Sequence, residues 1–384
     1  MAFSGFCQRI RIGTMNHYCD SAATMPILPE VWTELQKIHE HSVKKGINIS
    51  SVHACGHHFH QIYEKRLEHF LSNIGATARE WFWTSGATES NTWALRIALL
   101  NRPECNHLVL HPLLHSSLLE PAMEHANQYG LRVSFLTLDS DYQISFHNEH
   151  IDHNTIVLLP IGDNEIGSLQ KDWGVIEKMK NSGAWIHGDA AQSFGKIEMN
   201  FSKIPFDSVT ISGHKMGALI GIGALYLRLR PQKKVVPIFR GGGQQFGFRS
   251  GTLPYHLIMA FLAAFEVWHS SDIRERLKYI GNRMRDTCKA HLITPVYSCL
   301  PHICTIYDPK WSTKQILELA TKLTYSQGSA CQKGKGSEAL FKIGYDLNAQ
   351  RRIIRLSLGL QNFEDIEQIC QIVQDFLNIH PDHH

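Results

Sequence analysis

The sequence predicts an α/β protein with a large, mostly parallel sheet domain and a second, smaller α+β domain. Between residues 80 and 230, short apolar segments alternate with helical patterns, which is typical of a parallel sheet covered by helices on both faces. After residue 253 this alternation gives way to two long helical patterns. Hydrophobic residues make up 43% of the 384 residues, so the chain can bury a sizeable core.

The first part of the chain is expected to contain seven strands. They span residues 80–84, 107–111, 131–138, 155–160, 184–187, 208–211 and 222–229. The first strand turns at Ser85-Gly86 into a helix that begins near Thr88. Two more helices are expected over residues 116–130 and 173–181, and glycines at or just beyond their last turns favour helix ends there.

The second part begins with helical patterns over residues 257–269 and 273–292, which lead out of the sheet. A strand at 302–307, a helix at 314–322, a strand at 352–358 and a helix at 363–379 follow. The last helix carries apolar residues at 366, 369, 373, 376 and 377, the spacing of one buried face. We therefore expect a large domain over residues 16–260, and a small domain formed by residues 1–15 and 261–384.

Composition excludes several classes of protein. The net charge of +3 is too small to indicate nucleic acid or an anionic membrane as a partner. No apolar run approaches the roughly 20 residues of a membrane span, and the N-terminus has no secretory signal pattern. Nine scattered cysteines, an odd number, favour free thiols in a reducing compartment. The sequence thus predicts a cytoplasmic globular protein.

Polar residues that follow the expected strands are the first candidates for a site, because ligands bind at the carboxyl ends of parallel strands. Small residues in Ser85-Gly86-Ala87-Thr88-Glu89-Ser90 would let a helix N-terminus approach an anion. The alternative is an ordinary helix start, capped by Ser85 or Thr88.

A second candidate pairs Asp189, after the strand at 184–187, with Lys215, after the strand at 208–211. In parallel strands both side chains would lie at one edge of the sheet, with Ser212 and His214 available to a phosphate. An amine that forms a Schiff base and a carboxylate that keeps a pyridine nitrogen protonated are what pyridoxal 5'-phosphate requires. A surface ion pair beside a turn is the alternative.

Eight motifs in register resemble the pyridoxal-phosphate-dependent cysteine desulfurases of the class V aminotransferase group. They are Ser-Gly-Ala-Thr-Glu-Ser at 85–90, Asn-Glu-Ile-Gly at 164–167, His-x-Asp-x-x-Gln-Ser at 187–193, Ser-Gly-His-Lys at 212–215, Gly-Ala-Leu-Tyr at 223–226, Arg-Ser-Gly-Thr-Leu-Pro at 249–254, Gly-Ser-Ala-Cys at 328–331 and Arg-Leu-Ser-Leu-Gly at 355–359. The resemblance covers residues 18–376 and is strongest to the branch that supplies sulfur for iron–sulfur clusters and tRNA thiolation. It implies the type I fold of pyridoxal-phosphate-dependent transferases.

The resemblance also implies roles for individual residues. Lys215 would form the Schiff base, Asp189 would pair with the pyridinium nitrogen, and Gln192 would bond the phenolic oxygen of the cofactor. His115 would stack on the cofactor ring and could carry protons. The phosphate would be held by Ala87, Thr88, Ser212 and His214, and by Thr252 from the second subunit of a homodimer. Arg355 would bind the substrate carboxylate, with Asn164 and Asn48 assisting.

By the same resemblance, Cys331 would be the nucleophile that takes sulfur from L-cysteine, leaves L-alanine and carries a persulfide to an acceptor protein. Lys333 and Lys335, in the glycine-rich segment that follows it, would favour the thiolate. A small buried core cysteine is the alternative. Three other functions stay open: a selenocysteine lyase, a related aminotransferase or C–S lyase that does not need Cys331, and a non-catalytic dimeric partner.

The sequence departs from the family pattern at several positions. Ile49 replaces a proline after Asn48, Leu114 replaces a glutamate before His115, and Asp163 replaces an asparagine before Asn164. Asp163 would place an extra carboxylate near the substrate, where it could weaken binding or be neutralised by Arg355. Residues 218–221 replace a Gly-Pro-Lys-Gly segment, the loop after Cys331 is about two residues shorter, and the usual docking tail is missing.

Histidine is unusually frequent, with 24 residues, and the cluster Cys-Gly-His-His-Phe-His at 55–60 has the residue types of a metal site. However, His57 and His58 are adjacent and would point to different faces of a helix, and no second ligand pair lies at zinc spacing. We therefore expect a histidine-rich helix surface and no metal site.

Overall fold

The computed structural model describes residues 16–145, 150–229, 234–327 and 336–378. Its centre is a seven-stranded sheet in the order β2-β10-β9-β8-β7-β3-β4. The strands are β2 (Trp81–Thr84), β3 (His107–Leu110), β4 (Arg132–Phe135), β7 (Thr155–Pro160), β8 (Trp185–Asp189), β9 (Ser208–Ser212) and β10 (Gly223–Leu227). All run parallel except β10, which is antiparallel to both of its neighbours. The predicted α/β class with a mostly parallel sheet is confirmed.

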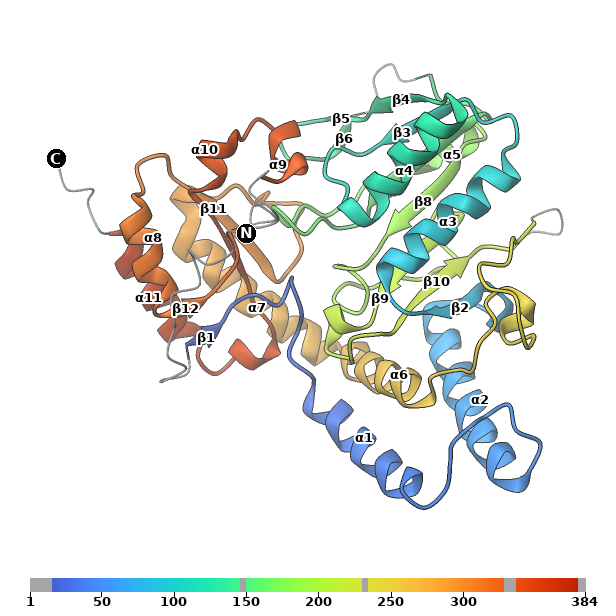
Figure 1. Cartoon of the computed structure of the whole chain (residues 1–384). Helices are drawn as coiled ribbons and strands as arrows, with labels where there is room; N and C mark the ends of the chain where they lie inside the picture. Colours follow the sequence, from blue (N-terminus) through green and yellow to red (C-terminus); the bar gives the residue numbers. More distant parts are fainter. Residues whose placement is uncertain (1–15, 146–149, 230–233, 328–335, 379–384) are drawn as a thin grey trace, which may run out of the picture.

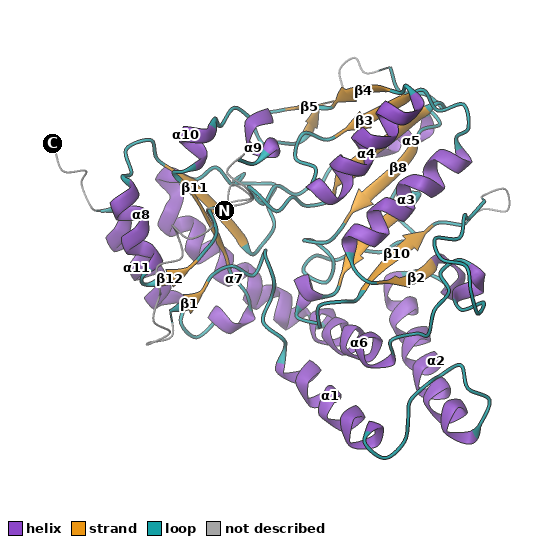
Figure 2. Ribbon diagram, in the orientation of Figure 1, coloured by secondary structure: helices purple, strands orange, loops and turns teal. Residues whose placement is uncertain are grey.

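Helices cover both faces of this sheet (Figures 1 and 2). On one face, α3 (Ala87–Asn101) and α4 (Ser116–Tyr129) bury Trp93, Leu95 and Leu118 against the strands. On the other face lie α2 (Ala54–Ile74), α5 (Trp173–Asn181) and α6 (Tyr255–His269). The strands are buried throughout, with the exception of the edge strand β4, which explains their nearly continuous apolar sequences.

The second part of the chain packs around the antiparallel pair of β11 (Ile303–Tyr307) and β13 (Ile353–Ser357). Its helices are α7 (Ser271–Cys288), α8 (Thr313–Ala320), α9 (Glu338–Lys342), α10 (Leu347–Gln350) and α11 (Ile366–Leu377). Helices α7 and α11 are shorter than the patterns predicted. A 3₁₀ turn at Lys289–His291 follows α7, and another at Leu360–Asn362 precedes α11.

The N-terminal segment crosses from the small part to the sheet. β1 (His17–Tyr18) pairs with β12 (Leu323–Thr324), and α1 (Pro29–Ser42) then packs against α6. This pairing brings residues 17–18, which we assigned to the large domain, beside the small one, so the domain boundaries stay a prediction. A short ribbon of β5 (Thr137–Leu138) and β6 (Ile144–Ser145) completes the strands. Within the described ranges, no helix is long and apolar enough to cross a membrane.

Candidate active site

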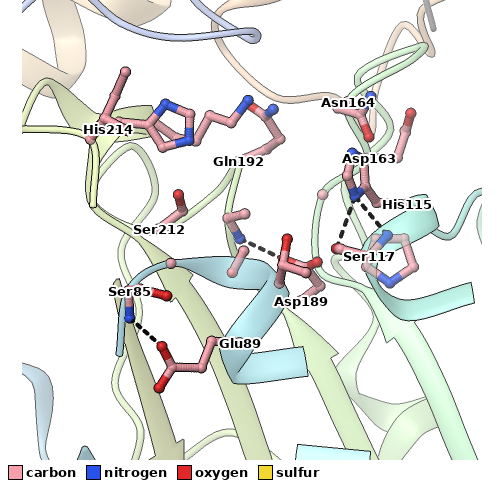
Figure 3. A pocket seen from close by; sticks show the side chains of 18 of the residues that line it. Ser85, Glu89, His115, Ser117, Asp163, Asn164, Asp189, Gln192, Ser212 and His214 are labelled. Atoms are coloured by element: carbon pink, nitrogen blue, oxygen red, sulfur yellow. Dashed lines mark hydrogen bonds between the residues drawn. The ribbon is translucent and has the colours of Figure 1, made fainter. Parts of the chain in front are cut away.

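The carboxyl ends of the parallel strands open onto a cavity of about 370 Å³. Asp189 ends β8 and Ser212 ends the neighbouring strand β9, so the pairing of these strands brings both side chains to one edge of the sheet. Lys215 follows in a 3₁₀ turn, His214–Met216. The cavity is lined by nine of the residues that the sequence singled out, namely Ala87, Thr88, His115, Asn164, Asp189, Gln192, Ser212, His214 and Lys215, and Figure 3 shows several of them around one space.

The amine of Lys215 is held by the N-terminal segment of the chain. Its Nζ donates to the carbonyl oxygens of Ala22, at 2.5 Å, and Ala23, at 2.7 Å. Removal of water lowers the pKa of Lys215 to about 8, and the nearby positive charge of Arg355 contributes. A pKa near 8 leaves roughly a tenth of this amine uncharged at pH 7, far more than for an ordinary lysine, and the uncharged form is the nucleophile.

The Asp189 carboxylate lies in a buried hydrogen-bond network. Its Oδ2 accepts from Asn91 Nδ2 at 2.9 Å, and its Oδ1 accepts from the backbone N–H of Ala191 at 2.9 Å. Asn91 Oδ1 lies 3.1 Å from Nε2 of His187, whose Nδ1 contacts Ser208 Oγ at 2.8 Å. Because burial lowers the pKa of His187 to about 4, this ring is neutral and can donate to Asn91, which fixes the amide that orients Asp189.

His115 is the N-cap residue of α4, with its side chain beside the cavity. Its Nδ1 accepts from the Ser117 backbone N–H at 3.1 Å and lies 2.9 Å from Ser117 Oγ. Ser117 Oγ also accepts from Asn91 Nδ2 at 2.9 Å, so Asn91 links the ring to Asp189. Loss of water lowers the pKa of His115, against the opposing charge of Asp189. A neutral ring with its Nε2 free of these contacts can carry a proton.

The start of α3 presents unsatisfied backbone donors to the cavity. Its N-cap residue is Gly86, with no side-chain cap among the described residues, so the alternative of a helix start capped by Ser85 or Thr88 is not what the structure has. Gly86 has φ = 153°, and a Cβ at Gly223 would come within 2.7 Å of its Cα. The two glycines therefore let this turn lie directly on β10, and the start of α3 lines the same cavity as Ser212.

Arg355 lies in β13 and reaches towards the cavity from the small part. Its guanidinium is buried and donates to the Asn164 carbonyl oxygen at 2.7 Å and to Asp20 Oδ1 at 3.0 Å. Its Nε has no hydrogen-bond partner among the described residues. Asp20, which the sequence did not single out, thus holds the guanidinium beside Asn164.

Asp163 is buried at the wall of the cavity, and its carboxylate is hydrogen-bonded within its own loop. Oδ1 accepts from the backbone N–H groups of Glu165 and Ile166, both at 2.8 Å, and Oδ2 accepts from the backbone N–H and the hydroxyl of Ser168. The expectation that the Asp163 carboxylate could be neutralised by Arg355 is wrong, because these four hydrogen bonds orient the carboxylate towards its own loop and Arg355 pairs with Asp20 instead. Burial nevertheless raises the pKa of Asp163, against the effect of these donors.

Two other departures from the family pattern are accommodated locally. Leu114 is buried at 3% exposure and packs in the apolar core between α4 and the sheet, where a glutamate would have to be desolvated. In the segment 218–221, Ala218 is buried while Ile220 and Gly221 line the cavity.

Asn48, Thr252 and Arg355 are predicted site residues that are not among the described residues lining this cavity. Asn48 is exposed and its Oδ1 accepts from the Ser50 backbone N–H at 3.0 Å, and Thr252 is also exposed. Cys331, with its neighbours at 328–335, lies outside the described residues, so its role stays a prediction.

The histidine-rich segment at 55–60 lies on α2. His57, His58 and His60 are exposed there while Phe59 is buried, as expected for a helix surface. Over the described ranges, no group of three or more histidine, cysteine or acidic residues could hold a metal ion.

Sequence reasoning missed Asn91, Ser117, His187 and Asp20. The signal for Asn91 was present, because it lies four residues after Ala87 and so on the helix face that Ala87 presents. His187 was quoted only as part of a motif, and nothing in the sequence pairs Asp20 with a residue 335 positions away.

Comparison with known proteins identifies relatives over nearly the whole chain. Residues 17–369 match the family described as Aminotransferase class-V. A cysteine desulfurase IscS of Buchnera aphidicola subsp. Acyrthosiphon pisum (strain 5A) is 31% identical over 354 residues, which are 89% of this chain and 87% of the relative. A cysteine desulfurase IscS of Rickettsia typhi is 28% identical over 400 residues, 97% of this chain and 95% of the relative.

Solved structures show the same fold. A NifS-like protein has a TM-score of 0.83 at 24% identity and covers 95% of this chain and 100% of its own. A structure described as SspA in complex with cysteine has a TM-score of 0.77 at 26% identity, and covers 89% of this chain and 98% of its own.

Proposed function

The chain belongs to the class V aminotransferase family, and from this premise we propose that it is a pyridoxal-phosphate-dependent cysteine desulfurase. It would convert L-cysteine to L-alanine and pass the sulfur atom through Cys331 to an acceptor protein. The observation that carries the proposal is the convergence of Lys215, Asp189 and His115 on one cavity. Cysteine desulfurase relatives and the cysteine complex of SspA support the choice of substrate.

The residues present fit pyridoxal phosphate. Lys215 would hold the cofactor covalently, and Asp189, oriented by Asn91, would face the ring nitrogen. The uncapped N-terminus of α3, together with Ser212 and His214, suits a phosphate, because free N–H groups and a helix dipole favour an anion. When bound, pyridoxal phosphate supplies an electron sink that stabilises negative charge at the substrate α-carbon.

The residues of the chain would then bind the substrate and move protons. Arg355, held by Asp20 and the Asn164 carbonyl, would receive the substrate carboxylate, and its unpartnered Nε is a further donor. Lys215, whose amine has a pKa of about 8, is suited to take a proton from the α-carbon, and His115 to move one near the sulfur.

Cys331 would accept the sulfur. Its thiolate attacks the substrate sulfur, an S–S bond forms as the C–S bond breaks, and the carbon fragment takes up a proton to leave as L-alanine. L-cysteine and a thiol give L-alanine and a persulfide, so this transfer needs no external oxidant or reductant. The persulfide would then pass to an acceptor protein.

We also propose that a second subunit completes the site. Thr252 and Asn48, which the family resemblance assigns to the site, are exposed and outside the cavity of this chain. Large apolar side chains are exposed within a few positions of them in the sequence, including Val52 at 88% and Phe246 at 55%. Burial of such side chains against another copy would stabilise a dimer, which supports a contribution of Thr252 to the partner's phosphate site.

The test is the production of L-alanine and sulfide from L-cysteine by the wild type and by Cys331→Ala, each loaded with cofactor. Activity of the wild type alone would support the desulfurase. Activity of both would indicate a C–S lyase, turnover of selenocysteine without cysteine would indicate a selenocysteine lyase, and inactivity of both with bound cofactor would favour the non-catalytic partner.

A further inference from the structure

A second buried network lies behind the cavity, and the proposed mechanism does not use it. Lys196 and His302 are each about 1% exposed. Lys196 Nζ lies 3.2 Å from the Gln192 carbonyl oxygen and 3.0 Å from His302 Nε2. His302 Nε2 is also 3.3 Å from Oε1 of the Gln192 side chain. Lys196 comes from the loop after β8, and His302 directly precedes β11 in the small part of the chain.

The contacts of Gln192 settle which way its amide points. Its Nε2 lies 2.9 Å from the Ala22 carbonyl oxygen, which can only accept, so the NH₂ group faces Ala22. Its Oε1 therefore faces His302, and needs a donor there. The NH₂ group has a second hydrogen, which remains for the cavity that Gln192 lines.

The protonation states of His302 and Lys196 follow from the same comparison of hydrogen-bond donors and acceptors. Only a proton on His302 Nε2 gives Gln192 Oε1 a donor. The other tautomer would leave two groups unsatisfied, Oε1 and a buried Nδ1–H, because Nδ1 has no partner among the described residues. With a proton on Nε2, the neighbouring Lys196 amine must be neutral, so that its lone pair and not an N–H faces the ring.

The electrostatic surroundings agree with this arrangement. Lys196 Nζ contacts no carboxylate among the described residues. Burial lowers the pKa of Lys196 well below its usual value, and the charge of Lys215 adds to the effect. Burial also lowers the pKa of His302 well below its usual value, and the charge of Arg355 adds to the effect. A neutral amine beside a neutral imidazole is thus the favoured state.

We propose that His302 and Lys196 are positioning residues that fix the Gln192 amide, so that one of its N–H groups faces the cavity beside Lys215. The inference rests on the proposed function, in which Gln192 bonds the phenolic oxygen of pyridoxal phosphate. Without the donor at His302, Oε1 loses its partner and the amide can rotate. The Ala22 carbonyl oxygen, which also accepts from Lys215, would then hold the lysine but not the glutamine.

The test uses the dimeric holoenzyme and compares His302→Leu, Lys196→Met and Gln192→Leu. We expect each to change the visible absorbance maximum and the visible circular dichroism of the bound cofactor, and to raise the dissociation constant of pyridoxal phosphate from the apoprotein. We also expect kcat/KM to fall about tenfold, mainly through kcat, as for the loss of one hydrogen bond. His302→Gln keeps a donor and should restore the spectrum.

Two controls separate positioning from stability. Ile303→Val removes a buried methylene next to His302 and should lower the melting temperature without a change in the spectrum. In the double variant His302→Leu/Gln192→Leu, the loss of kcat/KM should remain about tenfold, because the residues act through one another. A loss near a hundredfold, or an unchanged spectrum in both His302→Leu and Lys196→Met, would overturn the proposal. A wild type that binds no pyridoxal phosphate would overturn the proposed function as well.

Discussion

The residues of the cavity and the exposed residues Asn48 and Thr252 would represent two different ways of building the proposed site. In the cavity, the side chains of Lys215, Asp189 and His115 are held by hydrogen bonds within one chain. Asn48 and Thr252 are exposed and lie outside it. Contacts within one chain therefore bring the first group together, while we propose that the second group acts through another copy of the chain.

The largest effect is expected from the cavity. Lys215→Ala removes the amine that would hold the cofactor and take the α-proton. The turnover of L-cysteine should fall by about 10²–10⁴-fold or more, the contribution of a positioned acid–base group. The visible absorbance of the protein-bound cofactor should disappear. A variant that retained this absorbance after dialysis would remove Lys215 from its role.

The exposed residues can be tested by mixing variants. Thr252→Ala alone should weaken retention of pyridoxal phosphate about tenfold, the effect of one hydrogen bond to a charged group. If Thr252 serves the other subunit, a heterodimer of Thr252→Ala and Lys215→Ala chains has one intact site. Such mixtures should regain about half of the wild-type activity per heterodimer. No gain on mixing would show that Thr252 acts within its own chain, or not at all.

The lowered pKa of Lys215 predicts how the empty cavity responds to pH. Only the neutral amine reacts with the cofactor aldehyde, and its fraction rises as the pH rises through about 8. The rate of cofactor capture by the apoprotein should therefore increase about tenfold between pH 7 and pH 9. Arg355→Met removes a positive charge that lowers this pKa, so its midpoint should move to higher pH. A downward movement would contradict the electrostatic assignment.

The smallest effect is expected at Asp163, although it lines the cavity. Asp163→Asn restores the residue type that the family usually has. The amide of asparagine has only one oxygen that can accept hydrogen bonds, where the carboxylate has two. Because the carboxylate serves its own turn, kcat/KM for L-cysteine should change less than about threefold, while the melting temperature falls by several degrees as up to two of four hydrogen bonds are lost. Much tighter substrate binding would show that the charge does reach the substrate.

The sequence predicts the parts of the site that follow from local order. The strand at 155–160 and the helix at 173–181 have the predicted bounds, and the parallel pairing of β8 with β9 brings Asp189 and Ser212 to the same edge. This works because apolar runs and turn residues act over a few positions, and because the direction of parallel strands fixes which ends meet.

The remaining features depend on contacts between distant residues. Asp20 pairs with Arg355, and His302 contacts Gln192, which is 110 positions away in the sequence. Neither pair produces a local sequence pattern. The orientation of the Asp163 side chain could not be predicted from the sequence either, because an acidic residue beside a site can face the ligand or its own backbone. Only the donors of residues 165, 166 and 168 decide between the two.

The Ala22 carbonyl oxygen accepts both from Lys215 and from Gln192, and so ties the segment at residues 20–24 to two residues that we propose to hold the cofactor. Residues 20–24 also contribute Asp20 to Arg355 and Thr24 to His214. An affinity tag, a fusion or a deletion that displaces this short segment would therefore disturb cofactor and substrate groups simultaneously.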